Sequence, residues 1–156
     1  MVYWLMWMAN RFRGREIILI ILGYQEMSYF VTGGTGFIGR FLVEKLLERS
    51  EKIYLLVQEK SLDRYEQLLE RLGVSKEEVV AVIGTLTEPN LGISDSDMSM
   101  LKGSVTNFYH LAAIYDLYAS EEIQQSVNVE GTRNAVQAAT AMDAKCFQQV
   151  SSIAAA

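Results

Sequence analysis

The stretch that decides the fold reads YFVTGGTGFIGRFL, from Tyr29 to Leu42. A short run of β-prone residues ends at Thr32, and four glycines follow within seven residues. Three of them, Gly33, Gly36 and Gly39, have the spacing G-x-x-G-x-x-G, and a segment with helical apolar periodicity follows directly. The stretch therefore predicts a strand, a tight glycine turn and a helix.

Each glycine of this motif has its own expected task. Gly33 permits a tight turn with unusual backbone angles, Gly36 lets the backbone approach a pyrophosphate, and Gly39 lets the helix pack closely on the sheet. Gly34 adds freedom, and Thr32 can brace the turn through its hydroxyl. Free N–H groups at the helix N-terminus would then hold the phosphates. The alternative is a tight turn with no ligand; a Walker loop is excluded because no Gly-Lys-Ser/Thr follows.

Outward from this motif, strand-like and helix-like segments alternate. We expect strands at residues 28–31, 52–57, 79–84, 105–113 and 145–152. We expect helices at residues 37–50, 61–73, 95–101 and 120–142, the last bent or split near 128–132. Alternation of this kind predicts an α/β fold with a doubly wound, Rossmann-like parallel sheet, incomplete, of about five strands with helices on both faces.

Two of the expected helices carry more detailed predictions. The apolar positions expected on the buried face of the helix after the glycines are Ile38, Phe41, Leu42, Leu46 and part of the pair Val43 and Leu47. The next helix is expected to begin with a capping serine, Ser61, and to end at Gly73. Its residues at helical spacing are Leu62, Tyr65, Leu69 and Leu72.

Length and composition limit the possible functions. At 156 residues the chain is one domain or part of one, and half of its residues are hydrophobic. A net charge of -5 argues against nucleic-acid binding, which needs a basic face. The chain has one histidine and neither an HExxH nor a CxxC pattern, so no zinc site is expected. Cys146 is the only cysteine, which fits a reducing, cytoplasmic location.

Residues 1–26 differ from the rest and are interpreted as an atypical leader, outside a dinucleotide-binding region at 27–156. The longest apolar run of the leader, from Ile17 to Leu22, is six residues. A membrane span needs about 20, and no small-residue cleavage site follows as in a signal peptide. A membrane role is therefore not expected.

Several motifs in the same order resemble the extended short-chain dehydrogenase/reductase family. They are TGGTGFIG, then YHLAA from Tyr109, NVEGT from Asn128 and VSSIA from Val150. Within that family the segments LLV, LTEPNLG and HLAAIYDL look most like the thioester reductases and fatty acyl-CoA reductases of the "male sterility" type. The resemblance covers most of residues 27–156 and corresponds to the N-terminal part of such a protein.

The resemblance implies roles for individual residues. The backbone groups of Phe37 and Ile38 would join the glycines at the pyrophosphate. The expected cofactor-lining residues at the end of the fourth strand are His110, Ala112 and Ala113. Asn128 would hold a helix bend to that strand through hydrogen bonds, or be a plain surface asparagine. For His110 the equal alternative is a histidine satisfied within the protein.

The catalytic residue implied by the resemblance is Ser152, which would polarise the substrate carbonyl. Its neighbour Ser151 is the weaker candidate, and a strand-end serine without a catalytic part is the alternative.

The chain departs from the family pattern after its second and third strands. Gln58 stands where NADP-binding relatives commonly carry Arg, and the next residue, Glu59, is an acid that could accept from the 2′-OH of NAD. Arg40 and Lys60 are nearby cations, and the resemblance slightly favours NADP(H) over NAD(H). After the third strand the family usually has Gly-Asp-Leu around the adenine; the last two positions here are Thr85 and Leu86.

A further departure concerns the catalytic Tyr-x-x-x-Lys. No tyrosine of this chain is followed by a lysine four residues later. That pair supplies the proton in carbonyl reduction. We therefore expect the dinucleotide-binding part of an oxidoreductase for acyl thioesters, aldehydes or ketones, inactive by itself. The alternatives are a non-catalytic dinucleotide-binding module and a fragment of a nucleotide-sugar epimerase or dehydratase.

Overall fold

The computed structural model describes residues 27–49, 52–114 and 120–151. The leader expected at residues 1–26 and the serine expected to be catalytic, Ser152, lie outside these ranges. No helix within them is long and apolar enough to cross a membrane.

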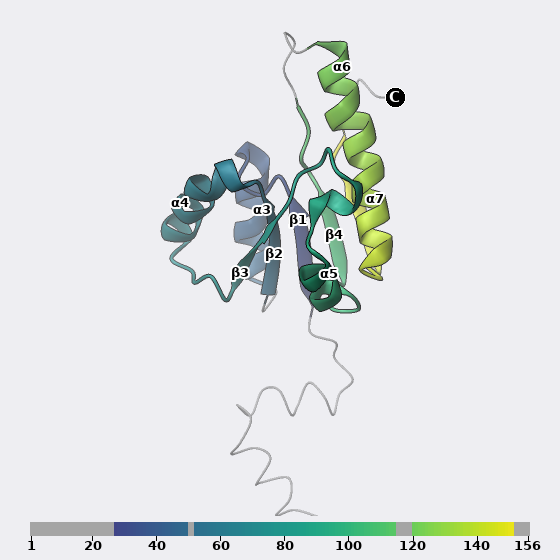
Figure 1. Cartoon of the computed structure of the whole chain (residues 1–156). Coiled ribbons are helices and arrows are strands. Elements are labelled where there is room, and N and C mark those ends of the chain that lie inside the picture. Colours follow the sequence, from purple (N-terminus) through teal and green to yellow (C-terminus); the bar gives the residue numbers. More distant parts are fainter. Residues whose placement is uncertain (1–26, 50–51, 115–119, 152–156) are drawn as a thin grey trace, which may run out of the picture.

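The centre of the fold is a sheet of five parallel strands in the order β3-β2-β1-β4-β5 (Figure 1). The strands are β1 (Ser28–Thr32), β2 (Lys52–Val57), β3 (Val79–Ile83), β4 (Asn107–His110) and β5 (Cys146–Gln149). Thr32, at the end of β1, pairs with Leu56 on one side and His110 on the other, so the carboxyl ends of the three central strands share one edge. The predicted doubly wound parallel sheet is confirmed.

Helices cover both faces of this sheet, as predicted. On one face lie α3 (Phe37–Leu47) and α4 (Leu62–Leu72); on the other lie α5 (Asp95–Leu101) and α7 (Gly131–Ala141) (Figure 1). Short 3-10 turns, η1 (Glu59–Ser61) and η2 (Pro89–Gly92), follow β2 and β3. The predicted irregular helix is present as α6 (Glu121–Gln124), a π-helical segment η3 (Gln125–Glu130) and α7 in direct succession.

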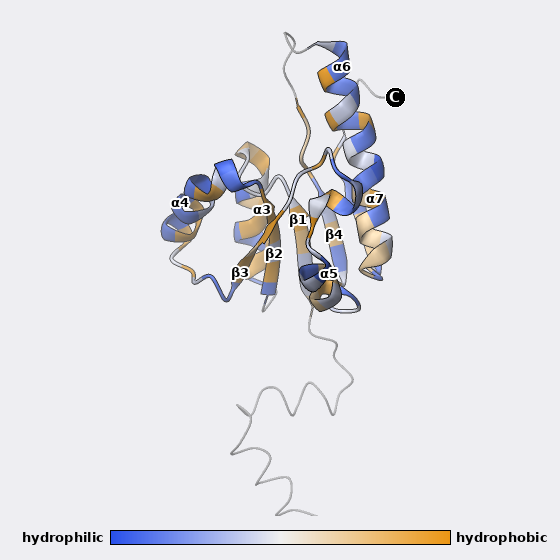
Figure 2. Cartoon of the chain, in the orientation of Figure 1, coloured by the Kyte–Doolittle hydropathy of each residue, from blue (hydrophilic) through white to orange (hydrophobic). Residues whose placement is uncertain are grey.

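Successive side chains of a strand point to opposite faces of the sheet and pack into two separate hydrophobic cores. In β1, Phe30 packs with the α5 and α7 side, while Tyr29 and Val31 pack with the α3 and α4 side. Phe30 stacks on Phe108 with ring centroids 4.8 Å apart. Figure 2 shows hydrophobic residues concentrated in β1, β2 and β3. Burial on both faces explains why β1 and β2 are nearly continuous apolar runs.

The face predicted for α3 is partly wrong. Its buried residues are Gly39, Val43 and Leu46, whereas Ile38 and Phe41 are 59% and 50% exposed. Gly39 has no side chain and lies directly against the turn, so the helix approaches the sheet along the line through this glycine. Apolar periodicity alone could not locate a contact line that contains a glycine.

The ends of α4 give one correction and one confirmation. Ser61 occupies the N-cap position, but its side chain makes no capping hydrogen bond. It closes the preceding η1 turn with φ -115° and ψ 10°, not in the extended conformation that a capping serine adopts. Gly73 ends the helix in the left-handed conformation, φ 65°, as predicted. On the predicted apolar face Leu62 is exposed, and Leu68 is buried instead.

Candidate functional site

The glycine turn between β1 and α3 is tightly closed by its own backbone. Gly33 has φ +74°, and its carbonyl oxygen accepts a hydrogen bond from the Gly36 N–H at 3.0 Å. A Cβ on Gly33 would lie 2.7 Å from the Ala112 nitrogen, and one on Gly39 would lie 2.1 Å from the Gly33 oxygen. The turn therefore touches both the exit of β4 and the first turn of α3, and its geometry requires glycine at these two positions.

Gly36 differs, because it faces outward at the N-terminus of α3. It is exposed, its backbone is extended, and it has no side chain that could cap the helix. Helix geometry leaves the first N–H groups, those of Phe37 and Ile38, without intrahelical acceptors. A side chain at Gly36 would stand in the space in front of these groups. The open backbone and the positive end of the helix dipole fit a pyrophosphate.

Thr32 and His110 hold this turn to the rest of the sheet through a hydrogen-bonded chain. The Ala112 N–H donates to Thr32 Oγ1 at 3.2 Å, and Thr32 Oγ1 lies 2.7 Å from His110 Nδ1. On the other side of the ring, His110 Nε2 lies 3.3 Å from Thr132 Oγ1, which donates to the Asn128 carbonyl at 2.7 Å. This series of hydrogen bonds, called the His110 chain below, links β1 and β4 to the π-helical segment.

This series of hydrogen bonds determines which ring nitrogen of His110 carries the proton. Since the Thr132 hydroxyl donates to a carbonyl, its oxygen accepts from Nε2–H, and the bare Nδ1 accepts from the Thr32 hydroxyl. Burial lowers the pKa of His110 from 6.5 to about 4, so the ring is neutral at physiological pH. The imidazole is satisfied within the protein, one of the two alternatives open from sequence. A contact between His110 and a cofactor stays a prediction.

Asn128 clamps the loop that leaves β4. Its Oδ1 accepts from the Ile114 N–H at 2.8 Å, and its Nδ2 donates to the Ile114 carbonyl at 3.0 Å. Both bonds go to one residue, so the side chain imitates the pairing of a neighbouring strand. The π-helical segment η3 carries Asn128, and π-bulges of this kind are frequent at functional sites.

A hollow of about 440 Å³ lies at the carboxyl ends of β2 and β3. It is lined by Gln58, Glu59, Lys60, Ile83, Gly84, Thr85, Glu88 and Gly92. Within it the Gln58 amide donates to Thr85 Oγ1 at 3.4 Å. In open α/β sheets, ligands bind in crevices outside the carboxyl ends of the strands. Three residues expected at the cofactor, Gln58, Lys60 and Thr85, are thus brought together here.

The loop after β3 is fastened beneath this hollow. Thr85 donates its N–H to the Leu91 carbonyl at 2.7 Å, and Asn134 on α7 donates to the Leu86 carbonyl at 2.8 Å. Leu86 is 7% exposed and belongs to the core, and it is not among the residues that line the hollow. The loop is therefore closed on itself through Thr85 and Leu91 and anchored to α7 through Asn134.

Arg40 does not line the hollow, unlike Lys60. Its guanidinium carbon lies 4.9 Å from the ring centroids of both Phe37 and Phe41, in cation–π contact with each. Among the described residues its buried Nε has no hydrogen-bond partner. The two aromatic rings hold Arg40 on the first turns of α3, beside the glycine turn.

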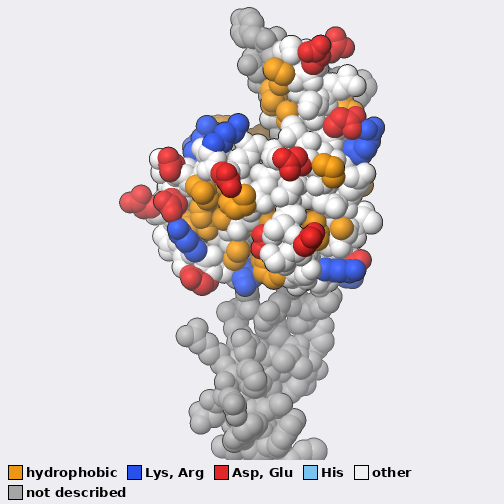
Figure 3. Space-filling view, viewed as in Figure 1, with side chains coloured by type: hydrophobic (Ala, Val, Ile, Leu, Met, Phe, Trp, Pro, Cys, Tyr) orange, Lys and Arg blue, Asp and Glu red, His pale blue; other side chains and the backbone are white. Residues whose placement is uncertain are grey.

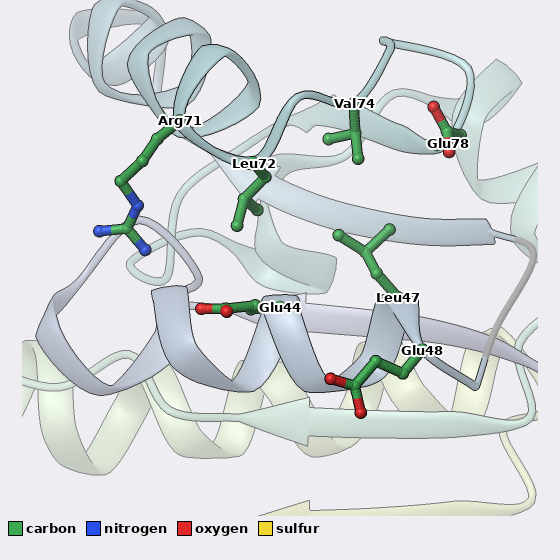
Figure 4. Close-up of a pocket in the computed structure, with 7 residues that line it drawn as sticks. All are labelled: Glu44, Leu47, Glu48, Arg71, Leu72, Val74 and Glu78. Carbon is green, nitrogen blue, oxygen red and sulfur yellow. The ribbon is translucent and has the colours of Figure 1, made fainter.

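A second hollow, of about 490 Å³, lies between α3 and α4 (Figure 4). Its lining includes Glu44 from the later part of α3, Glu48 directly after α3, Arg71 from α4, and Glu78, which directly precedes β3. It therefore opens near the amino ends of the strands, away from the glycine turn. In Figure 3, acidic and basic side chains lie interspersed over the visible face of the described residues.

The sequence analysis did not predict Glu88 and Thr132 as site residues, nor Ile83, Gly84 and Gly92 of the hollow. Glu88 lines the hollow, and Thr132 joins the His110 chain. Glu88 directly precedes the only proline, in the loop after a predicted strand, which was a usable signal. Thr132 lies in the motif NVEGT, but the motif does not indicate its partner, because the contact with His110 spans 22 positions of sequence.

Comparison with known families identifies the chain. The model of the male sterility protein family, a family of NAD-binding domains, matches residues 31–156, which include the glycine turn and the loop after β3. The chain belongs to this family. The predicted resemblance to the male sterility type of reductase is confirmed, and a nicotinamide dinucleotide is the cofactor class of the domain.

The relatives include fatty acyl-CoA reductases and a gramicidin synthase. Fatty acyl-CoA reductase 1 of Homo sapiens is 30% identical over 145 residues, covering 82% of this chain and 28% of that protein. A linear gramicidin synthase of Brevibacillus parabrevis is 31% identical over 138 residues, covering 83% of this chain and 3% of that protein.

Solved structures show the same fold. The terminal R domain of the myxalamid PKS-NRPS pathway superposes with a TM-score of 0.71 at 29% identity, covering 85% of this chain and 36% of that chain. The reductase domain of a non-ribosomal peptide synthetase from Mycobacterium tuberculosis gives a TM-score of 0.68 at 26% identity, covering 82% and 33%. The chain thus spans about a third of these two domains.

Proposed function

We propose that the chain is the NAD(P)-binding part of a reductase that transfers hydride to an acyl thioester, an aldehyde or a ketone. The observation that carries the proposal is the uncapped N-terminus of α3 behind the open Gly36. There, backbone N–H groups and the helix dipole would bind the pyrophosphate. The acyl-CoA and peptide-synthetase reductases among the relatives support the thioester as the substrate class.

In this proposal the dinucleotide supplies the hydride, and the residues of this chain bind and orient it. The contacts are assigned to Thr32, Gly33, Gly36, Phe37, Ile38, Gly39, Arg40, Gln58, Lys60, Thr85, Leu86, His110, Ala112, Ala113 and Asn128. The His110 chain and the Asn128 clamp would act from behind the turn, because their side chains are occupied by protein partners. The site would then be formed before the dinucleotide binds.

We propose NADP(H), by a slight margin, as the preferred cofactor. Lys60 lines the hollow and has no ion-pair partner among the described residues, and Arg40 lies on the adjacent first turns of α3. Both could attract a 2′-phosphate. Glu59 in the same hollow favours the 2′-OH of NAD instead. The proposed preference for NADP(H) over NAD(H) is therefore small.

We also propose that Ser152 polarises the carbonyl and that this chain does not turn over substrate by itself. No Tyr-x-x-x-Lys occurs in these 156 residues, which span about a third of the related reductase domains. In this proposal the functional region is residues 27–156, and a cytoplasmic location fits the lone Cys146.

The test combines a binding titration with a turnover assay. NADPH fluorescence should change saturably on addition of the chain, while NADPH oxidation with acyl-CoA or carrier-bound thioesters should stay at background. Gly36→Ala should lower the affinity for NADPH about tenfold. Gly103→Ala, away from the turn and with no atom within 4 Å, is the control for a glycine substitution outside the site. A folded chain that binds neither NADPH nor NADH would refute the proposal, and robust turnover would refute its catalytic incompleteness.

A further inference from the structure

The hollow beside β3 contains a carboxylate with no assigned task. Glu88 lines it together with Thr85 and Gly92. The Glu88 side chain folds back over the loop, because a Cβ built on Gly92 would lie 2.7 Å from Glu88 Oε2. Within the described residues Glu88 has neither an ion pair nor a side-chain hydrogen bond. Both oxygens are thus free to accept hydrogen bonds in the hollow.

The loop presents Glu88 in a defined position. Leu91, a residue type that rarely adopts positive φ, has φ 63°, between Asn90 at 50° and Gly92 at 62°. The Leu91 N–H donates to the Glu88 carbonyl at 3.0 Å, and the Leu91 side chain is fully buried. The strained backbone is held by this burial, as is common where a loop positions a functional group.

Two other polar residues of the hollow, Thr85 and Glu59, differ from Glu88 in their contacts or position. Thr85 Oγ1 already contacts the Gln58 amide at 3.4 Å and Thr87 Oγ1 at 3.3 Å. Glu59 begins η1 directly beyond β2, the place where an acid meets the ribose in this type of fold. A base bound beyond the ribose, toward β3, would meet Glu88.

We propose that Glu88 accepts a hydrogen bond from the exocyclic amine of the adenine, in a chain that has Thr85 where an aspartate was expected. This assignment rests on the proposed dinucleotide binding. An amine donor and a carboxylate acceptor form a charge-assisted hydrogen bond, among the stronger kinds. A base with a carbonyl oxygen at that position would instead place two acceptors against each other and lose affinity. Glu88 thereby makes the site specific for adenine.

The test compares NADPH with its hypoxanthine analogue, in which a carbonyl oxygen replaces the exocyclic amine. The wild-type chain should bind NADPH about tenfold more tightly or better, the range of a hydrogen bond to a charged group. In Glu88→Ala the affinities for the two dinucleotides should become nearly equal, mainly because the affinity for NADPH falls. Glu59→Ala, on the ribose side of the hollow, is the matched control and should change both affinities by the same factor.

The results separate the two proposals. Binding of both dinucleotides with equal affinity by the wild-type chain, or an equal loss of both in Glu88→Ala, would overturn the role of Glu88 and leave cofactor binding intact. Binding of neither by a folded wild-type chain would overturn both. Glu88 is exposed, so its variant should unfold at the wild-type urea concentration, which verifies that affinity alone has changed.

Discussion

The glycine turn and the hollow are two halves of one candidate site, built in opposite ways. The turn is made of backbone: Gly33 and Gly39 meet main-chain atoms at distances that exclude a Cβ. The hollow is lined by Gln58 after β2, by η1, by the last residue of β3 and by the loop after β3, and all of these residues are half-buried or exposed. We therefore expect substitutions at Gly33 and Gly39 to cost more stability than substitutions in the hollow.

The largest effect is expected from Gly39→Ala. The new methyl would lie 2.1 Å from the Gly33 oxygen, a backbone atom that cannot move without opening the turn. Overpacking costs about 1–3 kcal/mol, and we expect the upper end of this range in urea unfolding. Gly103→Ala meets no atom within 4 Å but has φ +73°, so it reports the cost of left-handed backbone strain alone, which Gly39 in α3 does not carry. A loss of stability in Gly39→Ala no larger than the loss in Gly103→Ala would contradict the close contact.

The next effect is the dependence of stability on pH through His110. Its folded-state pKa of about 4 lies below the unfolded value of 6.5, so between these values the unfolded chain binds more protons. The stabilisation is complete above the unfolded value and is lost as pH falls toward the folded one. From about pH 7 to about pH 5 the unfolding free energy should fall by about 2 kcal/mol.

His110 is the only histidine of the chain, so His110→Gln supplies the control. The unfolding free energy of this variant, measured in urea, should be lower than that of the wild-type chain at neutral pH. It should be nearly independent of pH over the same interval. An unchanged pH dependence in the variant would assign the effect to other groups.

Gly36→Ala should separate binding from folding. The new methyl would touch only the Gly33 oxygen, at 3.1 Å, and φ -76° suits alanine. The melting temperature should change little, while the affinity for NADPH should fall about tenfold, or about 1.4 kcal/mol, because the methyl stands before the helix N-terminus. A large loss of stability with unchanged affinity per folded molecule would make Gly36 part of the scaffold only.

The smallest effect is expected for Thr85→Val in the hollow. It removes the acceptor of a long hydrogen bond from the Gln58 amide, which remains able to reach water. Unfolding free energy and NADPH affinity should each change by about 1 kcal/mol or less. A loss as large as that of Gly39→Ala would remove the contrast between the two halves of the site.

The same contrast explains what the sequence could predict. The glycine spacing specifies backbone geometry locally, so the strand, turn and helix were predicted correctly from Tyr29 to Leu42. Alternation of apolar runs was sufficient for the five parallel strands. The exposed Ile38 and Phe41 were mispredicted because the contact line of α3 passes through a glycine, which carries no periodicity signal.

The hollow was harder to predict because distant segments make it. Thr85 and Gln58 are 27 positions apart, and Glu88 lies in the hollow because three successive residues with positive φ fold the loop back. Similarly, Thr132 closes the His110 chain from a helix that begins after β4. Such contacts depend on the packed fold, not on local pattern.

The most direct test of the central claim is an amide NMR titration of the ¹⁵N-labelled chain with NADPH. We predict that the N–H signals of Gly36, Phe37 and Ile38 shift saturably, followed by those of residues in the hollow, while Glu48 and Val74 in the groove between α3 and α4 stay unchanged. Shifts confined to that groove, or none in a folded chain, would contradict dinucleotide binding at the glycine turn.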